Sequence, residues 1–179
     1  PECENMVMNA FREAMRMEES GGLGISMKHS KTILTRIDAM KNHVSASLKV
    51  MESLKERFAI MANKKVRNEE QLAAIITNVF ELKMKSKQEE LTEQAKTLIF
   101  TITDNYTRNV NNVNPQLRGT LFDAYQCITF YLNHQAGSRN TAKSGGYDEA
   151  ARRQISVVSP NGTGFKAANR AMSTLLAIK

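Results

Sequence analysis

A cysteine and a histidine, residue types that can support covalent catalysis, lie on the same predicted helix. Cys127 and His134 are seven residues apart, and Tyr131 lies between them. A cysteine nucleophile needs its base at hydrogen-bonding distance, whereas seven residues of helix separate two side chains by about 10 Å along the axis. The spacing therefore indicates a buried thiol and a helix-terminal histidine, and it predicts no catalytic residue.

A metal site is not indicated either. His29, His43 and His134 occur singly along the chain. Cys3 and Cys127 are likewise too far apart in sequence to form a paired ligand motif. A zinc site needs three or four such ligands brought together. We therefore expect no metal and no cofactor, and we favour a non-enzymatic protein over an enzyme without excluding the enzyme.

Positive charge is the chemical feature that remains. The 179 residues include 25 Lys and Arg against 18 Asp and Glu, which gives a formal net charge of +7 and a pI near 9.5. From Gln135 to Lys179 there are seven basic and two acidic residues, a net charge of +5. A surplus of this kind favours acidic partners such as nucleic acid, and it also keeps a protein soluble.

Two groups of basic residues are candidate phosphate contacts. The first lies where a predicted extended segment meets a long helix, so that backbone amides and cations could converge on a phosphate. The second surrounds a glycine-rich loop, where a basic segment could order on a nucleic-acid backbone and Tyr147 could stack on a base. The candidate nucleic-acid-binding residues are Lys28, His29, Lys31, Arg36, Arg139, Lys143, Arg152, Arg153, Lys166 and Arg170. A solvated basic surface is the competing interpretation.

The elements that must position these residues are mainly helices, because apolar residues recur at spacings of three and four. Helices are predicted over approximately residues 5–20, 30–61, 69–80, 87–106 and 120–134, from Asp148, and over residues 165–176. Thr120 is the predicted cap of the helix over residues 120–134. The predicted apolar face of the helix over residues 69–80 consists of Leu72, Ile75, Ile76, Val79 and Phe80. Alternation of Leu23, Ile25 and Met27 with polar residues predicts a short strand, for which the chain offers no partner. We expect a mainly α fold, a multi-helix bundle with one long helix and at most a short β element near residues 23–28.

The long helix carries a heptad pattern. One heptad position holds Ile33, Met40, Leu54 and Met61, and the other holds Ile37, Val44, Met51 and Phe58. A helix of ~30 residues is ~45 Å long, so it should pack against another long helix or a partner chain. Leu48 widens the apolar stripe, which favours an intramolecular bundle over a two-stranded coiled coil.

The length of the chain fits one domain. Residues 1–179 form either a single helical domain or the C-terminal part of a larger α+β domain, because the chain begins at Pro1 and its strand lacks a partner. Residues 135–147 are predicted to be a flexible loop. The sequence has no long apolar run, so we expect no membrane span, and two cysteines suit a reducing cytoplasm.

Four short stretches resemble a phage and plasmid protein family known as domain of unknown function 932. They are Cys3-Glu4-Asn5 with Asn9 to Ala14, Lys28-His29-Ser30, Gly119 to Ala124 continuing to His134, and Gly162 to Lys166. The resemblance implies the later, helical part of a longer domain whose earlier part is richer in strands. It also implies a setting in mobile genetic elements, with no assigned reaction. Phe122 departs from the family, whose members commonly have Trp, so no role is carried over for that ring.

Taken together, these features predict a non-enzymatic nucleic-acid-binding protein of a phage or plasmid. It would contact the phosphate backbone without strong base specificity, in recombination or replication. The alternative is a structural or assembly protein that forms homo-oligomers through the long heptad helix. An enzyme is the third possibility. We expect the protein in the cytoplasm of the host cell, or in the virion if it is structural.

Overall fold

The computed structural model describes Arg12 and residues 33–82, 91–136 and 149–179, without the side chains of residues 33–40, 43, 149 and 150. The helices of this part are α2 (Ile33–Ala62), α3 (Glu69–Val79), α4 (Glu93–Thr107), α5 (Leu121–Phe130), α6 (Glu149–Val158) and α7 (Thr163–Leu176). A 3₁₀ turn, η1 (Pro115–Leu117), precedes α5, and a π-helical turn, η2 (Tyr131–Gln135), continues it.

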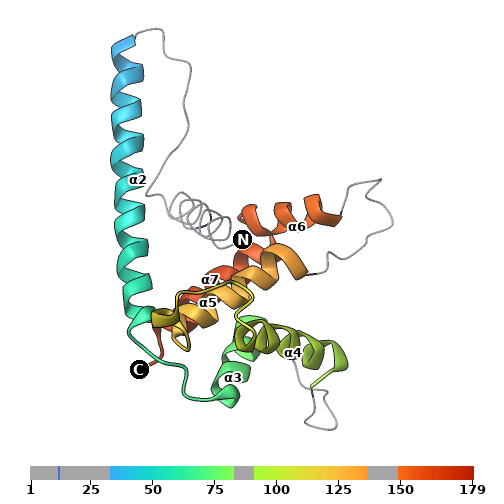
Figure 1. Ribbon diagram of the computed structural model, residues 1–179. Coiled ribbons are helices and arrows are strands. Elements are labelled where there is room, and N and C mark those ends of the chain that lie inside the picture. Colours follow the sequence, from blue (N-terminus) through green and yellow to red (C-terminus); the bar gives the residue numbers. More distant parts are fainter. Residues whose placement is uncertain (1–11, 13–32, 83–90, 137–148) are drawn as a thin grey trace.

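The described residues form a bundle of helices and contain no strand, which confirms the predicted mainly α fold. Figure 1 shows α5 and α7 in the middle of the bundle, with α3 and α4 on one side and α6 on the other. Lys65 and Thr120 form an isolated antiparallel bridge that the sequence pattern did not indicate. The β element expected near residues 23–28 lies outside the described residues.

Side chains cap the starts of three helices. Asn68 Oδ1 accepts a hydrogen bond from Gln71 N at 2.9 Å, at the start of α3. Thr92 Oγ1 likewise accepts from Ala95 N at 3.2 Å, at the start of α4. These bonds satisfy amides that have no partner inside the helix. The helix start predicted near Lys87 was therefore too early for α4, which begins at Glu93 because Thr92 supplies the cap.

Helix α5 lies at the centre of the core, and its residues from Leu121 to Thr129 are all buried. It packs against α2, α4 and α7. The neighbouring elements contribute the remaining residues of this core: Val50, Leu54 and Met61 from α2; Leu72, Ile75, Ile76 and Val79 from α3; Ile102 from α4; Leu132 from η2; Val157 from α6; and Ala167, Ala168, Ala171, Met172 and Leu175 from α7. Because α5 is buried on all sides, the positions of the helices around it depend on their packing against it.

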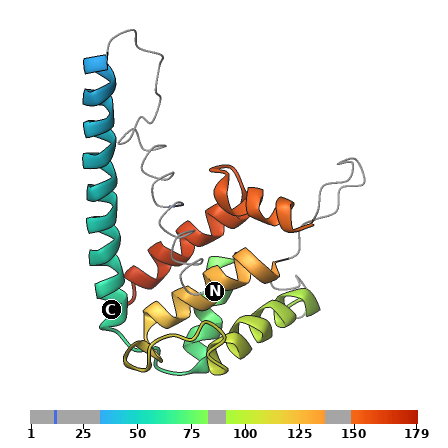
Figure 2. The ribbon, with the colours of Figure 1, turned by 45° about the horizontal axis from the view of Figure 1, so that its top comes forward.

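Among the α2 side chains that the structure describes, contact with this core begins at Ala46, and the buried ones are Val50, Leu54 and Met61. Figures 1 and 2 show α2 at one edge of the bundle, extending well past it. The exposed fractions of Val44, Leu48 and Met51 are 59%, 55% and 62%. Two of these residues were predicted to lie in the heptad seam. Val50 and Leu54 lie at the same height of α2 and are buried, so the three exposed residues lie on a face of the helix that is turned away from α5 and α7.

An ion pair between the buried Asp123 and the partly exposed Arg118 holds the start of α5. The carboxylate of Asp123 accepts from Arg118 Nη1 at 2.6 Å and from Gly119 N at 2.9 Å. Thr120 Oγ1 in turn accepts from the Asp123 amide at 3.3 Å, which makes Thr120 the predicted cap of α5. Burial raises the pKa of Asp123, and this effect outweighs the lowering by the Gly119 amide and by Arg118.

Arg12 is buried and connects the early part of the chain to its later part. Its Nε donates to Val157 O at 3.0 Å, at the end of α6, and its Nη2 donates to Asn133 Oδ1 in η2. Burial lowers the pKa of the Arg12 guanidinium. A buried charge of this kind is tolerated where hydrogen bonds replace those to water.

Candidate functional site

The close approach of α6 and α7 is set by two glycines. A Cβ atom added to Gly162 would lie 2.0 Å from Ser156 O, and one added to Gly164 would lie 2.6 Å from Val157 Cγ1. Ser156 Oγ accepts from Gly164 N at 3.0 Å and lies 3.1 Å from Thr163 Oγ1. The turn at residues 162–164 therefore brings the end of α6 directly against the start of α7.

This corner forms one wall of a cavity of about 650 Å³. The cavity lies among the end of α3, helices α4, α6 and α7, and the π-helical turn η2. Its lining residues are Phe80, Leu98, Tyr131, Leu132, Ala136, Arg152, Arg153, Ser156, Val157, Thr163, Gly164, Ala167 and Arg170. We refer to it as the arginine-lined cavity. Its volume falls within the range of small-molecule binding pockets, about 300–1,000 Å³.

Two of the three lining arginines also cap helix ends. Arg153 Nε donates to Ala136 O at 2.8 Å, and its Nη1 donates to His134 O at 2.6 Å, so it binds the end of η2. Arg170 Nε donates to Val79 O at 2.8 Å, at the end of α3, while its Nη1 lies 3.3 Å from Glu81 Oε1. These carbonyls have no partner inside their own helices. The guanidinium groups are therefore fixed in position relative to the two helix ends.

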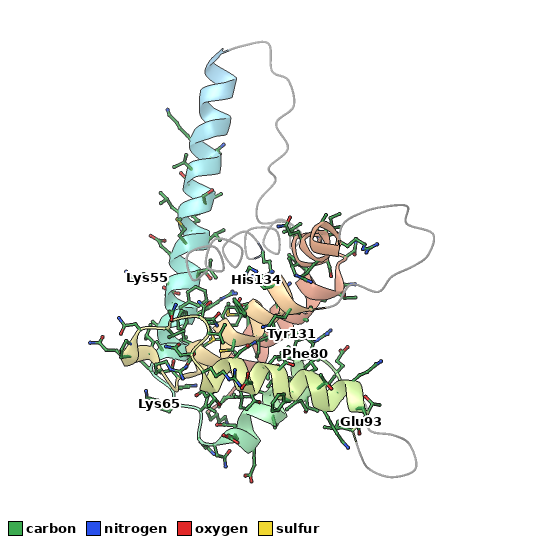
Figure 3. The ribbon with its side chains drawn as sticks, turned by 45° about the vertical axis from the view of Figure 1, so that its right-hand side comes forward. Lys55, Lys65, Phe80, Glu93, Tyr131 and His134 are labelled. Carbon is green, nitrogen blue, oxygen red and sulfur yellow. The ribbon has the colours of Figure 1, made fainter. Side chains whose placement is uncertain are left out.

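Part of the cavity lining is apolar and aromatic. Phe80 and Tyr131 are both half-buried, and their rings meet edge to face, with centroids 5.8 Å apart and planes at 87°. Figure 3 shows the two side chains next to each other near the centre of the molecule. Ala136 N donates to Tyr131 O at 2.7 Å, and this i→i+5 bond forms the π-helical turn. Such turns redirect side chains and are frequent at functional sites.

The electrostatics of the cavity favour an anion. Three guanidinium groups line it, and none of the lining residues that the structure describes is acidic. Glu81 contacts Arg170 from outside the lining, and 68% of its side chain is exposed, so solvent screens its charge. Arginine presents a planar fork of donors that matches phosphate or carboxylate oxygens. The arrangement can bind an anionic group that has an apolar or aromatic part.

The structure brings together three of the ten basic residues selected from the sequence. Arg152, Arg153 and Arg170 line the cavity, whereas Lys166 is exposed on α7 and does not line it. Arg36 lies on α2, where only its backbone is described. The other candidates, Lys28, His29, Lys31, Arg139 and Lys143, lie outside the described residues. So does most of the loop predicted for residues 135–147, although Gln135 itself belongs to η2 and exchanges hydrogen bonds with Asn105.

Cys127 and His134 have separate surroundings. The Cys127 thiol donates to Asp123 Oδ1 at 3.9 Å and accepts from Asn111 Nδ2 at 3.6 Å. Burial, with a further contribution from the Asp123 charge, raises the pKa of this thiol far above its ordinary value. The His134 ring instead stacks on Phe130, with centroids 4.7 Å apart. A protonated, buried thiol has little nucleophilic character.

The described part of the chain contains neither a metal-ligand cluster nor a membrane-spanning helix. No three side chains of His, Cys, Asp or Glu converge there as metal ligands would. Nor does that part include a helix with the length and apolar character that a bilayer crossing requires.

Comparison with protein families gives one match. Residues 3–158 match the family described as Domain of unknown function (DUF932). The matched region includes Arg152 and Arg153 and ends before α7, which carries Arg170. Neither the curated proteins nor the solved structures contain a significant match to the chain.

Proposed function

Because the chain belongs to the Domain of unknown function (DUF932) family, whose description gives no activity, we propose a function from the chemistry of the arginine-lined cavity. We propose that the protein binds nucleic acid, with phosphate groups held by Arg152, Arg153 and Arg170. The observation that carries the proposal is the gathering of three guanidinium groups in one cavity without an acidic residue among the described lining.

Phosphate suits this cavity better than a lone small anion does. The formal charge of +7 attracts a polyanion over a longer distance than any one side chain can. Hydrogen bonds to charged groups are worth about 1.5–3 kcal/mol each, so three guanidinium groups, two of them fixed at helix ends, can hold a phosphate backbone firmly. Lys166, exposed on α7, lies on an element that also lines the cavity and could contact a neighbouring phosphate.

The proposal includes the setting that the sequence resemblance implies. We place the protein in the host-cell cytoplasm of a phage or plasmid, in recombination or replication. Binding through phosphates without strong base specificity suits such a task, because those processes act on DNA of many sequences.

Fluorescence anisotropy with a labelled oligonucleotide, measured over a range of salt concentrations, tests the proposal. Arg152→Glu reverses a charge at the cavity. Lys55→Glu makes the same change in charge at an exposed position on α2 and is the matched control. Figure 3 shows Lys55 at a distance from Phe80 and Tyr131, which line the cavity. We expect Arg152→Glu to weaken binding about tenfold or more, since one charged hydrogen bond exceeds about 1.4 kcal/mol.

The salt dependence provides a second measurement. Each phosphate contact contributes about 0.7 to the slope of log K against log salt on a single strand. Loss of the contact at Arg152 should reduce the slope by about that amount, whereas Lys55→Glu should leave it nearly unchanged. Equal effects of the two substitutions would mean that only net charge matters and would contradict a site at the cavity.

A second function, assembly through α2, has an observation of its own. Val44, Leu48 and Met51 are separated by four and three residues, so they lie on one face of the helix, and each is more than half exposed. An exposed apolar stripe on a long helix is the kind of surface that another helix covers. In this case the protein would be a structural component, and the virion is its proposed location.

Sedimentation velocity over a hundredfold range of protein concentration tests assembly. Leu48→Gln removes the centre of the stripe, and Lys49→Gln changes the next residue, also exposed, as a control. If α2 mediates assembly, the wild-type sedimentation coefficient rises with concentration, Leu48→Gln abolishes the rise and Lys49→Gln preserves it. A wild-type protein that remains monomeric throughout excludes this function.

A further inference from the structure

The apolar side of the arginine-lined cavity is not needed for phosphate binding alone. Phe80, Leu98 and Tyr131 are each only half-buried, so part of each side chain faces the cavity or solvent. A protein that contacts only the backbone of a nucleic acid can do so with a flat basic surface. Half-exposed rings in a concave site indicate a ligand with an apolar face of its own.

The aromatic rings of Phe80 and Tyr131 and the guanidinium groups of Arg153 and Arg170 are attached to the same two helix ends. Phe80 directly follows Val79, whose carbonyl accepts from Arg170. Tyr131 begins the π-helical turn, whose later carbonyls accept from Arg153. An edge-to-face contact fixes the two rings without covering both faces of each. The distance from ring to guanidinium is therefore set before any ligand binds, which lowers the entropic cost of binding.

The geometry points to a single unstacked nucleotide as the occupant of the cavity. We propose that its base lies against Tyr131 and Phe80 while its phosphate contacts the arginines. This inference rests on the proposed nucleic-acid binding and makes it specific for single strands. In a duplex each base is covered by its neighbours above and below, so its face cannot reach an aromatic side chain. In a single strand a base can leave the stack at a small cost in free energy, and its face can then contact an aromatic side chain.

The experiment compares three ligands of equal length and label: an oligothymidylate, the same strand with several abasic sites, and a duplex. Contact between a base and an aromatic ring changes affinity about fivefold to 150-fold. We expect the abasic strand and the duplex each to bind about tenfold more weakly than the oligothymidylate. Equal affinity for the oligothymidylate and the abasic strand overturns the inference.

Substitutions at Tyr131 show whether the difference in affinity between the oligothymidylate and the abasic strand arises in the cavity. Tyr131→Leu should weaken binding of the oligothymidylate about tenfold and leave binding of the abasic strand unchanged. Tyr131→Phe keeps the ring and should keep full affinity, which separates a lost base contact from a folding defect. Phe100→Leu is the control, because Phe100 is 70% exposed on α4 and does not line the cavity. If Tyr131→Leu weakens both strands equally, the ring does not contact a base.

The outcomes distinguish this inference from the function on which it rests. Binding that depends on salt but is equal for all three ligands retains nucleic-acid binding and rejects the nucleotide site. Absence of binding to every strand rejects both. Competition with thymidine 5′-monophosphate shows whether the cavity binds a free nucleotide or a nucleotide within a strand. Because a free nucleotide lacks neighbouring phosphates, we expect it to displace the labelled oligothymidylate only weakly. If it binds tightly while no strand binds, the ligand is a free nucleotide and the strand proposal is wrong.

Discussion

Gly164→Ala is the sharpest test of how the cavity wall is built. The added methyl group would lie 2.6 Å from Val157 Cγ1 and 3.2 Å from Ser156 Oγ, at the point where α6 meets α7. Ordinary contacts between carbon atoms begin at about 3.5 Å, so α6 and α7 would have to separate or Val157 would have to move. The substitution therefore tests whether this wall depends on the absence of one side chain.

The expected cost follows from two opposing effects. Inserting a methyl group into a packed interface costs about 1–3 kcal/mol. Alanine in a helix is favoured over glycine by up to about 1 kcal/mol, which offsets part of this cost. We expect a net loss of about 1–2 kcal/mol, or a fall in Tm of about 2–8 °C for a chain of this length. Gly162→Ala should cost more, because its methyl group would meet the backbone oxygen of Ser156 at 2.0 Å and a carbonyl cannot rotate away.

The measurement is urea unfolding followed by circular dichroism at 222 nm, on single variants and on a double variant. Val157→Ala removes the atom that Gly164→Ala would strike. In the Val157→Ala background, Gly164→Ala should be close to neutral, with a coupling of about 1–2 kcal/mol between the two sites. If Gly164→Ala costs the same in both backgrounds, contact with Val157 is not the source of the destabilisation and the reasoning is refuted.

Three further predictions concern the buried groups around α5. Burial, with the nearby Asp123 charge, raises the pKa of Tyr106 from its ordinary value of 10 to about 12, so its contribution to stability is present below pH 10 and is lost between pH 10 and about 12. Tyr106→Phe should therefore lose less stability than wild type between pH 9 and 11 in urea titrations, and an identical loss would contradict the assignment. In a Cys3→Ser variant, Cys127 should not react with a thiol reagent at pH 8 until the protein is unfolded in urea, because burial keeps the thiol protonated; rapid reaction of the native protein would show that the site opens. Asp123→Ala should cost about 2–3 kcal/mol, because it leaves the Gly119 amide and the Arg118 guanidinium without their acceptor, whereas Asp104→Ala, in a largely exposed pair, should cost less than about 1 kcal/mol; equal costs in thermal unfolding would show that these two hydrogen bonds do not stabilise the start of α5.

Helix caps and buried helix faces could be predicted from the sequence, because each follows from residue types and spacings within one or two helical turns. Thr120 was predicted as a helix cap, and its Oγ1 accepts the Asp123 amide. The apolar spacing of Leu72, Ile75 and Val79 was sufficient to predict α3 and its buried face. These inferences need only contacts within one or two helical turns, which sequence order fixes.

The cavity could not be predicted in the same way. Arg170 and Val79 are 91 residues apart, and Arg153 and His134 are 19 apart, so their contacts depend on how whole helices pack. Arg152, Arg153 and Arg170 were selected from the sequence through charge alone, without any indication that they share a cavity. Phe80 was assigned to the buried face of α3, whereas it is half-exposed beside Tyr131, because the helix ends just before it. The exposure of Val44 and Met51 was also unpredictable, since periodicity shows which residues share a face and not what covers it.

Arg12 has a consequence for the order in which the protein folds. Its guanidinium binds Val157, 145 residues further along the chain. During synthesis at about 5–20 residues per second, Arg12 must wait roughly 7–30 seconds before its acceptor exists. Until then a charged side chain destined for the interior remains in water. Burial of Arg12 is therefore tied to the synthesis of α6, and a ribosome that stalls before α6 should leave this guanidinium without the Val157 acceptor.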